Sequence, residues 1–270
     1  MIEAREPHWL LLVEEQLQSV GYAVVTGFVP TSMLERLRPA MYAAQCQIEQ
    51  EIGTARLERA GERGVLRLLP KFDSAFTDLL ALPEMLQLVD HLLGPSAILH
   101  LQNGFILPPN QVDTQSVFQY QFHRDFPRYL AGYLASVNIF LAVDAFDTVN
   151  GATLVVPGTQ QLAHMPDTRY LQREAKALCC PAGSVIVFDS TLWHASGENS
   201  SPHDRLAINH QFTRSWIKQQ MDYCRALDAQ QLAQLPERTR QLLGYYTRVV
   251  TSLDEYYQAE DRRFYRRGQG

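Results

Sequence analysis

The chain has 270 residues, 46% of them hydrophobic and 20% charged, which is ordinary composition for a globular protein with a sizeable core. Its net charge of -5 and its pI near 5.9 argue against nucleic acid as a partner, because nucleic-acid-binding proteins usually carry a basic surface. The sequence shows no secretory signal and no run of roughly 18 apolar residues, so we expect a cytoplasmic protein that does not cross a membrane.

In the first third of the chain, the spacing of apolar residues predicts mainly helices. Trp9, Val13 and Leu17 recur at the spacing of one helix face. Thr31 or Ser32 is suited to cap the next helix, because a hydroxyl accepts a hydrogen bond from a free backbone N–H at a helix start. The predicted elements are a helix over residues 6–20, a strand over 22–28, a helix from 31 to 48, a polar surface loop over 52–66 and a helix over 75–93.

The pattern changes after residue 97. Short runs rich in Val, Ile, Phe and Leu are separated by turn residues such as Asn150-Gly151, which is typical of sandwiches, barrels and jelly rolls. A helical pattern returns over 225–265. We therefore predict one domain over residues 1–270, mainly β with flanking helices, whose β core spans about 97–214. The predicted strands cover 97–107, 117–124, 134–143, 152–156, 176–180, 184–189 and 206–213.

Two residues of metal-ligand type lie at the end of the predicted strand 117–124. Because side chains alternate along a strand, His123 and Asp125 are expected to point into one cavity while Arg124 points away. His194 lies just after a later predicted strand and is a natural third ligand. Two histidines and one carboxylate form the facial triad of non-haem Fe(II) oxygenases, which leaves metal positions open for other ligands.

Arg205 makes the prediction more specific, because it starts the strand that follows His194. A guanidinium binds a carboxylate through two parallel hydrogen bonds, which suits the distal carboxylate of 2-oxoglutarate. The hydroxyl of Ser196 can add a further hydrogen bond. Each feature alone has an ordinary explanation, such as a chance His-x-Asp or a solvated arginine. The ordered set carries the prediction.

Two alternatives remain open from the residues alone. A metal-dependent hydrolase or isomerase on a cupin-like barrel would use the same three ligands without needing Arg205. A non-catalytic binding module could keep the fold, although the presence of all three ligands favours an enzyme. A serine hydrolase and a nucleotide-binding fold are disfavoured, because the sequence lacks GxSxG, GxGxxG and GxxxxGK[ST].

Several segments beyond the triad resemble the phytanoyl-CoA dioxygenase family of Fe(II)- and 2-oxoglutarate-dependent oxygenases. The segments are GYAVVTGFVP, VNGATLVVPGTQ, GSVIVFDSTLWHASGENSSPHDR and LPERTRQLLGY. The resemblance covers roughly residues 15–245 and implies a double-stranded β-helix, the jelly-roll or cupin-like fold.

The resemblance also implies the roles of individual residues. His123, Asp125 and His194 match the iron ligands, Arg205 matches the residue that binds the 2-oxoglutarate carboxylate, and Ser196 matches an accessory contact. Fe(II), 2-oxoglutarate and O2 are therefore the expected cofactor and co-substrates.

Three further positions bear on the resemblance. Phe140 stands where some members have a tryptophan near the co-substrate, and Gln160 stands where the VPGSH motif has its histidine; both are departures. Asp125 is retained, whereas related halogenases replace this carboxylate with a small residue. Its retention implies hydroxylation or a related oxidation.

The expected reaction is hydroxylation of an unactivated carbon of a small-molecule metabolite, with release of succinate and CO2. The sequence does not give the substrate or the oligomeric state. Strand positions nominate Gln102, Gln119, Gln121 and Phe140 for the pocket and the co-substrate site. Tyr129 and Tyr133 are candidates for the pocket entrance. Arg56, Arg59, Arg63 and Arg67 either attract an anion or form a solvated face.

Overall fold

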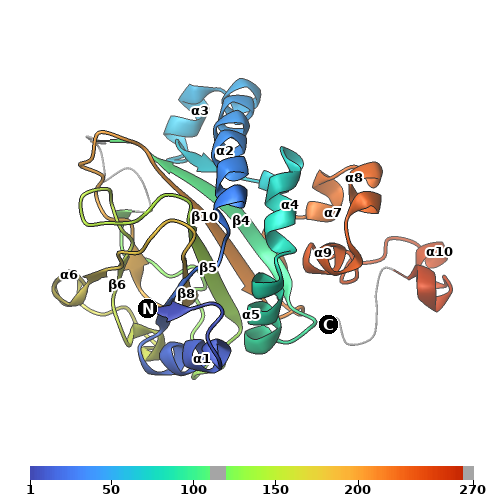
Figure 1. Cartoon of the computed structure of the whole chain (residues 1–270). Helices are drawn as coiled ribbons and strands as arrows, with labels where there is room; N and C mark the ends of the chain where they lie inside the picture. Colours follow the sequence, from blue (N-terminus) through green and yellow to red (C-terminus); the bar gives the residue numbers. More distant parts are fainter. Residues whose placement is uncertain (110–119, 264–270) are drawn as a thin grey trace.

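The computed structural model describes residues 1–109 and 120–263, and a seven-stranded sheet forms its centre (Figure 1). The strand order is β1-β2-β8-β5-β10-β4-β3, and the central pairs are antiparallel. A smaller sheet has the order β7-β6-β9. The strands are β1 (Ile2–Glu3), β2 (Tyr22–Thr26), β3 (Val65–Leu66), β4 (Ile98–Leu107), β5 (Ser136–Ala142), β6 (Leu154–Val155), β7 (Lys176–Ala177), β8 (Val185–Asp189), β9 (His194–Ala195) and β10 (Arg205–Thr213).

The two faces of the central sheet differ in chemistry, because side chains alternate along each strand. On β5, Val137, Ile139 and Leu141 are buried in the main hydrophobic core with the helices. Asn138 and Phe140 lie on the opposite face, which packs towards the smaller sheet. The candidate functional site lies on this second face.

Helices cover the apolar face of the central sheet (Figure 1). Helices α1, α2, α4 and α5 contribute buried residues to the main core, and α7 to α9 lie beside α4 and α5. The α-helices are α1 (Trp9–Ser19), α2 (Thr31–Ile52), α3 (Thr54–Arg59), α4 (Ser74–Leu80), α5 (Pro83–Leu93), α6 (Thr168–Glu174), α7 (Tyr223–Ala226), α8 (Ala229–Gln234), α9 (Glu237–Leu242) and α10 (Leu253–Tyr256). The 3-10 helices are η1 (Leu69–Lys71), η3 (Thr159–Gln161) and η4 (Glu260–Arg262).

Some of the predicted helical elements are wrong in detail. Helix α2 begins without a side-chain cap, so neither Thr31 nor Ser32 plays the predicted role. The predicted helix over 75–93 is two helices, α4 and α5. Pro83 starts the second of them, because proline fits the first turn of a helix but cannot continue a preceding one.

Two other segments also differ from the prediction. The expected loop over 52–66 contains the six-residue helix α3 and the short strand β3. The expected helical segment over 225–265 consists of several short helices, some of them begun by a side-chain cap. Asp222 and Asp228, for example, accept hydrogen bonds from the first turns of α7 and α8.

The main predicted strands are confirmed, with one exception. The predictions over 97–107, 134–143, 184–189 and 206–213 agree with β4, β5, β8 and β10 to within two residues at each end. The strand over 117–124 is wrong in its described part, because residues 120–124 form no continuous strand. Gln119 lies outside the described residues.

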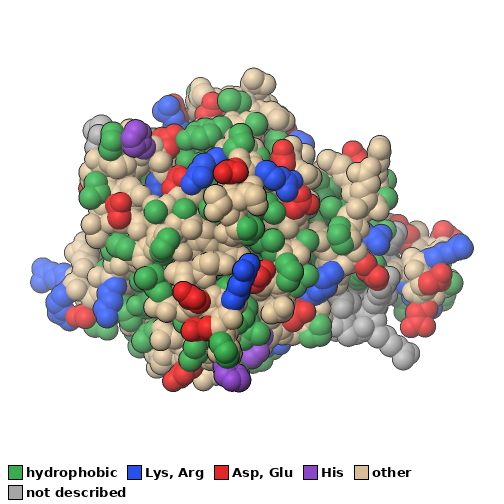
Figure 2. Space-filling model, in the orientation of Figure 1, with side chains coloured by type: hydrophobic (Ala, Val, Ile, Leu, Met, Phe, Trp, Pro, Cys, Tyr) green, Lys and Arg blue, Asp and Glu red, His purple; other side chains and the backbone are tan. Residues whose placement is uncertain are grey.

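In the described residues, no helix has both the length and the apolar character that a membrane crossing needs. On the face shown in Figure 2, Lys and Arg side chains are interspersed with Asp and Glu side chains. This mixture of charges is typical of a solvated protein surface.

Candidate metal and co-substrate site

Three side chains of metal-ligand type converge on the polar face of the central sheet. One possible ligand atom from each of His123, Asp125 and His194 lies within 4.8 Å of the others. The backbone brings them together: His123 and His194 exchange N–H···O=C hydrogen bonds of 3.0 and 3.1 Å. The expected cluster is therefore present. It is formed by the backbone bridge between His123 and His194. The predicted alternation of His123 and Asp125 along one strand does not form it.

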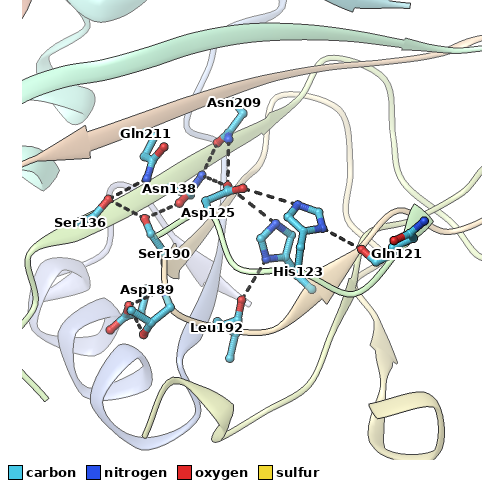
Figure 3. A network of polar contacts seen from close by, with 12 residues as sticks. Gln121, His123, Asp125, Ser136, Asn138, Asp189, Ser190, Leu192, Asn209 and Gln211 are labelled. Carbon is cyan, nitrogen blue, oxygen red and sulfur yellow. Dashed lines mark hydrogen bonds and ion pairs between the residues drawn. The ribbon is translucent and has the colours of Figure 1, made fainter. Parts of the chain in front are cut away.

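Each histidine is fixed in one orientation by its Nδ1 atom. The Nδ1 of His123 lies 2.7 Å from the carbonyl oxygen of Gln121, and the Nδ1 of His194 lies 3.0 Å from that of Leu192. A carbonyl can only accept, so each Nδ1 carries a proton, and in the neutral form of each imidazole Nε2 is the atom with a lone pair for a metal. The Nε2 atoms lie 3.5 and 3.7 Å from the Asp125 carboxylate oxygens. Figure 3 shows His123 and Asp125 pointing toward each other.

The ionisation states suit a cation. Burial raises the pKa of Asp125, but the charges of His194 and His123 and the hydrogen bond from Asn138 outweigh it and lower the pKa to about 2. Burial, together with the charge of His123, lowers the pKa of His194 to about 4. At neutral pH the cluster therefore contains an ionised carboxylate and a neutral imidazole, the forms that bind metal ions.

Two asparagines hold the Asp125 carboxylate. The amide of Asn138 donates to Oδ2 at 2.6 Å, and the amide of Asn209 reaches the same oxygen at 3.5 Å. Asn138 is held in turn by Ser190, whose hydroxyl donates to Oδ1 of Asn138 at 2.5 Å (Figure 3). Ser190 lies 2.8 Å from the hydroxyl of Ser136. Because Oδ2 carries these amide contacts, Oδ1 of Asp125 is the oxygen more available to a metal.

Replacing Asn138 by alanine is expected to weaken metal binding by about 10- to 100-fold, because the carboxylate loses the donor that orients it. Anaerobic titration of the metal-free protein with Fe(II), followed by calorimetry, measures this change. Asn103→Ala is the matched control, since Asn103 lies on the same sheet face without a hydrogen bond to Asp125. Equal Fe(II) affinity in a folded Asn138→Ala variant would show that the amide does not position the ligand.

Arg205 is a buried cation in the same cavity. Its side chain is 3% exposed, and its Nη2 donates to the carbonyl of Gly151 at 2.9 Å and to the hydroxyl of Ser196 at 3.3 Å. The guanidinium stacks on the ring of Phe146, 4.6 Å from its centroid. Burial lowers the pKa of Arg205 to about 10, so the side chain stays charged at neutral pH.

The charge of Arg205 has no carboxylate partner within ion-pair distance among the described residues, and its buried Nε has no hydrogen-bond acceptor. Burying a cation without an ion partner costs on the order of several kcal/mol. An anionic ligand at this position would remove that cost.

A cavity of about 380 Å³ connects the cluster and the arginine. It places the predicted Ser196 and Phe140 in the same lining as the three metal-ligand residues. Sequence reasoning missed the other polar lining residues, which include Tyr120, Asn103, Asn209 and Gln211. Asn103, Asn209 and Gln211 are amide side chains at alternate positions of otherwise apolar strands. That alternation in the sequence could have indicated a polar face.

Gln102 lies elsewhere, contrary to the expectation of a co-substrate contact. Its Nε2 donates to the carbonyl of Phe76 at 3.0 Å and lies 3.0 Å from Nε2 of His210, on the core face of the sheet. The assignment was off by one residue, because the neighbouring Asn103 is the one that faces the cavity.

The remaining candidates lie around the rim or outside it. Arg63 and Arg67 line the cavity and pair with Glu58 and Glu62. The cavity lining in the described residues contains neither Arg56 nor Arg59, and neither Tyr129 nor Tyr133. Gln121 contributes its backbone carbonyl to His123.

The sequence matches known proteins over most of its length. The family model of phytanoyl-CoA dioxygenase (PhyH) matches residues 17–207. The uncharacterized protein Rv1501 of Mycobacterium tuberculosis is 57% identical over 259 residues, which cover 96% of this chain and 95% of that protein. The dioxygenase af480 of Aspergillus fumigatus is 26% identical over 161 residues, covering 52% of this chain and 45% of that protein.

Solved structures of EctD from S. alaskensis share the fold. The structure with bound Fe has a TM-score of 0.63 at 15% identity and covers 82% of this chain and 81% of its own. The structure with 2-oxoglutarate and 5-hydroxyectoine has a TM-score of 0.59 at 17% identity and covers 78% and 77%. The predicted double-stranded β-helix is therefore confirmed. The chain belongs to the phytanoyl-CoA dioxygenase family of Fe(II)- and 2-oxoglutarate-dependent oxygenases.

Proposed function

We propose that His123, Asp125 and His194 hold Fe(II), that Arg205 binds the distal carboxylate of 2-oxoglutarate, and that Ser196 and Phe140 flank this co-substrate. The enzyme then hydroxylates an unactivated carbon of a small-molecule metabolite, with release of succinate and CO2. The observation that carries this proposal is a buried guanidinium without a carboxylate partner in the described residues, in one cavity with two histidines and a carboxylate.

The donor set fits Fe(II). Two neutral imidazoles and one carboxylate are the ligands of the non-haem iron facial triad, and they leave positions open on one side of the metal. Both imidazoles present Nε2, and the Asn138 amide occupies the carboxylate oxygen Oδ2. The site is thus oriented before a metal arrives.

The spacing along β10 fits a five-carbon diacid. Asn209 contacts the Asp125 carboxylate, and Arg205 lies four residues away on the same strand, about 13 Å along its length. An extended arginine side chain and 2-oxoglutarate together bridge such a distance. Arg205 would bind the end of the co-substrate far from the metal.

Bound Fe(II) and 2-oxoglutarate supply the oxidation chemistry by activating O2, and the protein supplies placement and exclusion of water. Phe105, Phe140 and Phe188 line the cavity and form apolar walls around the polar groups. Ser196 donates its own hydroxyl proton to the Gly197 carbonyl while it accepts from Arg205, so it holds the guanidinium in place.

The hydrolase or isomerase alternative is not supported. It gives Arg205 no role, whereas an oxygenase that uses 2-oxoglutarate requires a cation at this position. Family membership favours the oxygenase as well.

The proposal is tested by measuring succinate from 2-oxoglutarate with Fe(II), in air and under nitrogen. We expect succinate only when Fe(II), 2-oxoglutarate and O2 are all present, and more of it when a substrate is added. Turnover of a substrate under nitrogen without 2-oxoglutarate would instead support the hydrolase or isomerase.

A further inference from the structure

We propose that the part of the cavity beside β3 and β4 is the substrate subsite, and that it takes an uncharged, hydroxyl-rich compound of the polyol or sugar class. This inference rests on the proposed function for the reaction, but its binding test does not. It excludes apolar chains and amines as the preferred substrates.

The strand register places this subsite on the far side of the metal cluster from Arg205. Asn209, which contacts Asp125, pairs with Asn103 on β4, and Gln211 lies two residues farther along β10. Gln211 is therefore about 20 Å along the strand from Arg205, with the metal cluster between them. Asn103 and Gln211 are diagonal neighbours on one sheet face, about 7 Å apart.

Two carboxamide oxygens in this region have unused capacity to accept hydrogen bonds. Asn103 is 4% exposed, and its Oδ1 is buried without a hydrogen-bond partner. Gln211 is 1% exposed, and its Nε2 donates to the Ser136 hydroxyl at 3.0 Å, so Oε1 is its uncommitted end among the described contacts. Oδ1 of Asn103 is an unsatisfied buried acceptor, which is destabilising, and a ligand that brings a donor removes that penalty. Oε1 of Gln211 is a second acceptor that a ligand can use. The subsite therefore favours a ligand with at least two donors.

The surrounding charges select the kind of donor. Asp125 is the sole carboxylate in the described cavity lining, and the metal cluster uses it. Arg63 and Arg67 line the same edge, which disfavours an ammonium group. Their pairing with Glu58 and Glu62 means that they do not require an anion either. Neutral donors remain, and hydroxyl groups also offer oxygens that the arginines can donate to.

The cavity size agrees with a compact ligand. A volume of about 380 Å³ is near the lower end of small-molecule pockets, roughly 300–1,000 Å³, and 2-oxoglutarate takes part of it. Leu101 and Phe105 lie two residues before and after Asn103 on β4, and all three face the cavity. They provide apolar contact for the C–H faces of a ring or chain whose hydroxyls meet the amides.

The test compares three sets of compounds of similar size with the Fe(II)-loaded protein and 2-oxoglutarate under nitrogen. The hydroxyl-rich probes are myo-inositol, sorbitol and methyl glucoside; the apolar probes are hexanol and cyclohexylmethanol, with one hydroxyl each; the amine probes are hexylamine and 1,5-diaminopentane. Binding is measured by calorimetry, and succinate formation in air is the second readout. We expect at least one hydroxyl-rich compound to bind and to increase succinate formation. We expect none of the apolar or amine probes to do so.

Variants on adjacent positions of β4 separate the subsite from general effects. Asn103→Leu, which keeps the size and removes the acceptor, should weaken hydroxyl-rich ligands at least about tenfold and leave Fe(II) and 2-oxoglutarate binding unchanged. Gln102→Leu is the matched control, because this neighbouring amide faces the core. Sugars stabilise most folded proteins by exclusion, and the comparison of the two variants removes that contribution.

The outcomes separate the two proposals. Preference for apolar or amine probes, failure of every hydroxyl-rich probe, or equal binding to wild type and a folded Asn103→Leu variant overturns the subsite. Hydroxyl-rich binding that Asn103→Leu abolishes supports the subsite even if no succinate forms. In that case the proposed oxygenase reaction fails and the inferred ligand class stands.

Discussion

Replacing Asp125 by alanine is expected to abolish 2-oxoglutarate turnover and to weaken Fe(II) binding by more than about 100-fold, beyond the range for residues that only support a ligand. The variant loses the sole anionic ligand of the cluster. It also removes the carboxylate that both the Asn138 and the Asn209 amides contact, which leaves Asn138 only its hydrogen bond to Oδ1 of Asn209. His123→Ala and His194→Ala should act in the same direction. Fe(II) calorimetry and succinate formation are the two measurements.

A matched control separates loss of the ligand from loss of a half-buried carboxylate. Asp189 ends β8 and accepts hydrogen bonds from the backbone and the hydroxyl of Thr191 rather than joining the cluster. Asp189→Asn should therefore keep Fe(II) affinity. Turnover above background in a folded Asp125→Ala protein would remove this carboxylate from the mechanism.

The sheet was predictable because its pattern is strong and local. Strands β4, β5, β8 and β10 are apolar runs bounded by turn residues, and that pattern fixes an element without knowledge of its partners. The break at Pro83 was also visible in the sequence, but the apolar spacing on both sides of it predicted one helix. The spacing of apolar residues indicates which face of a helix is buried. It does not indicate whether one helix continues through the whole segment.

The site was predictable in its residues and not in its geometry. His123 and His194 are 71 positions apart, and the bridge between them is a long-range contact that no local pattern contains. Asn138 was visible as a polar residue in an apolar strand, but its contact with Asp125 is a tertiary contact, because Asp125 lies outside the strands. Gln102 shows the sensitivity of such reasoning, because a shift of one residue moves a side chain to the opposite face.

Arg205→Ala is the variant that distinguishes an oxygenase using 2-oxoglutarate from any other enzyme with the same metal ligands. Truncating one partner of a buried charge pair costs about 2–5 kcal/mol, so the 2-oxoglutarate concentration needed for half-maximal turnover should rise roughly 30-fold or more. Fe(II) affinity should stay the same, because Arg205 donates to Gly151 and Ser196 and not to the metal cluster. Succinate formation at graded 2-oxoglutarate concentrations measures the effect.

Two further variants and a second readout make this prediction specific to the guanidinium. Arg205→Lys keeps a charge but loses the forked donor pair, and its 2-oxoglutarate requirement should lie between those of wild type and alanine. Arg67→Ala removes another cavity arginine, one that already has Glu62 as its partner, and should leave that requirement unchanged. 2-Oxoglutarate should raise the melting temperature of the wild-type Fe(II) protein, because it binds the folded state, and at the same concentration should raise that of Arg205→Ala by less. If 2-oxoglutarate stabilises Arg205→Ala as much as wild type, the co-substrate binds elsewhere and the buried cation of this cavity has another purpose.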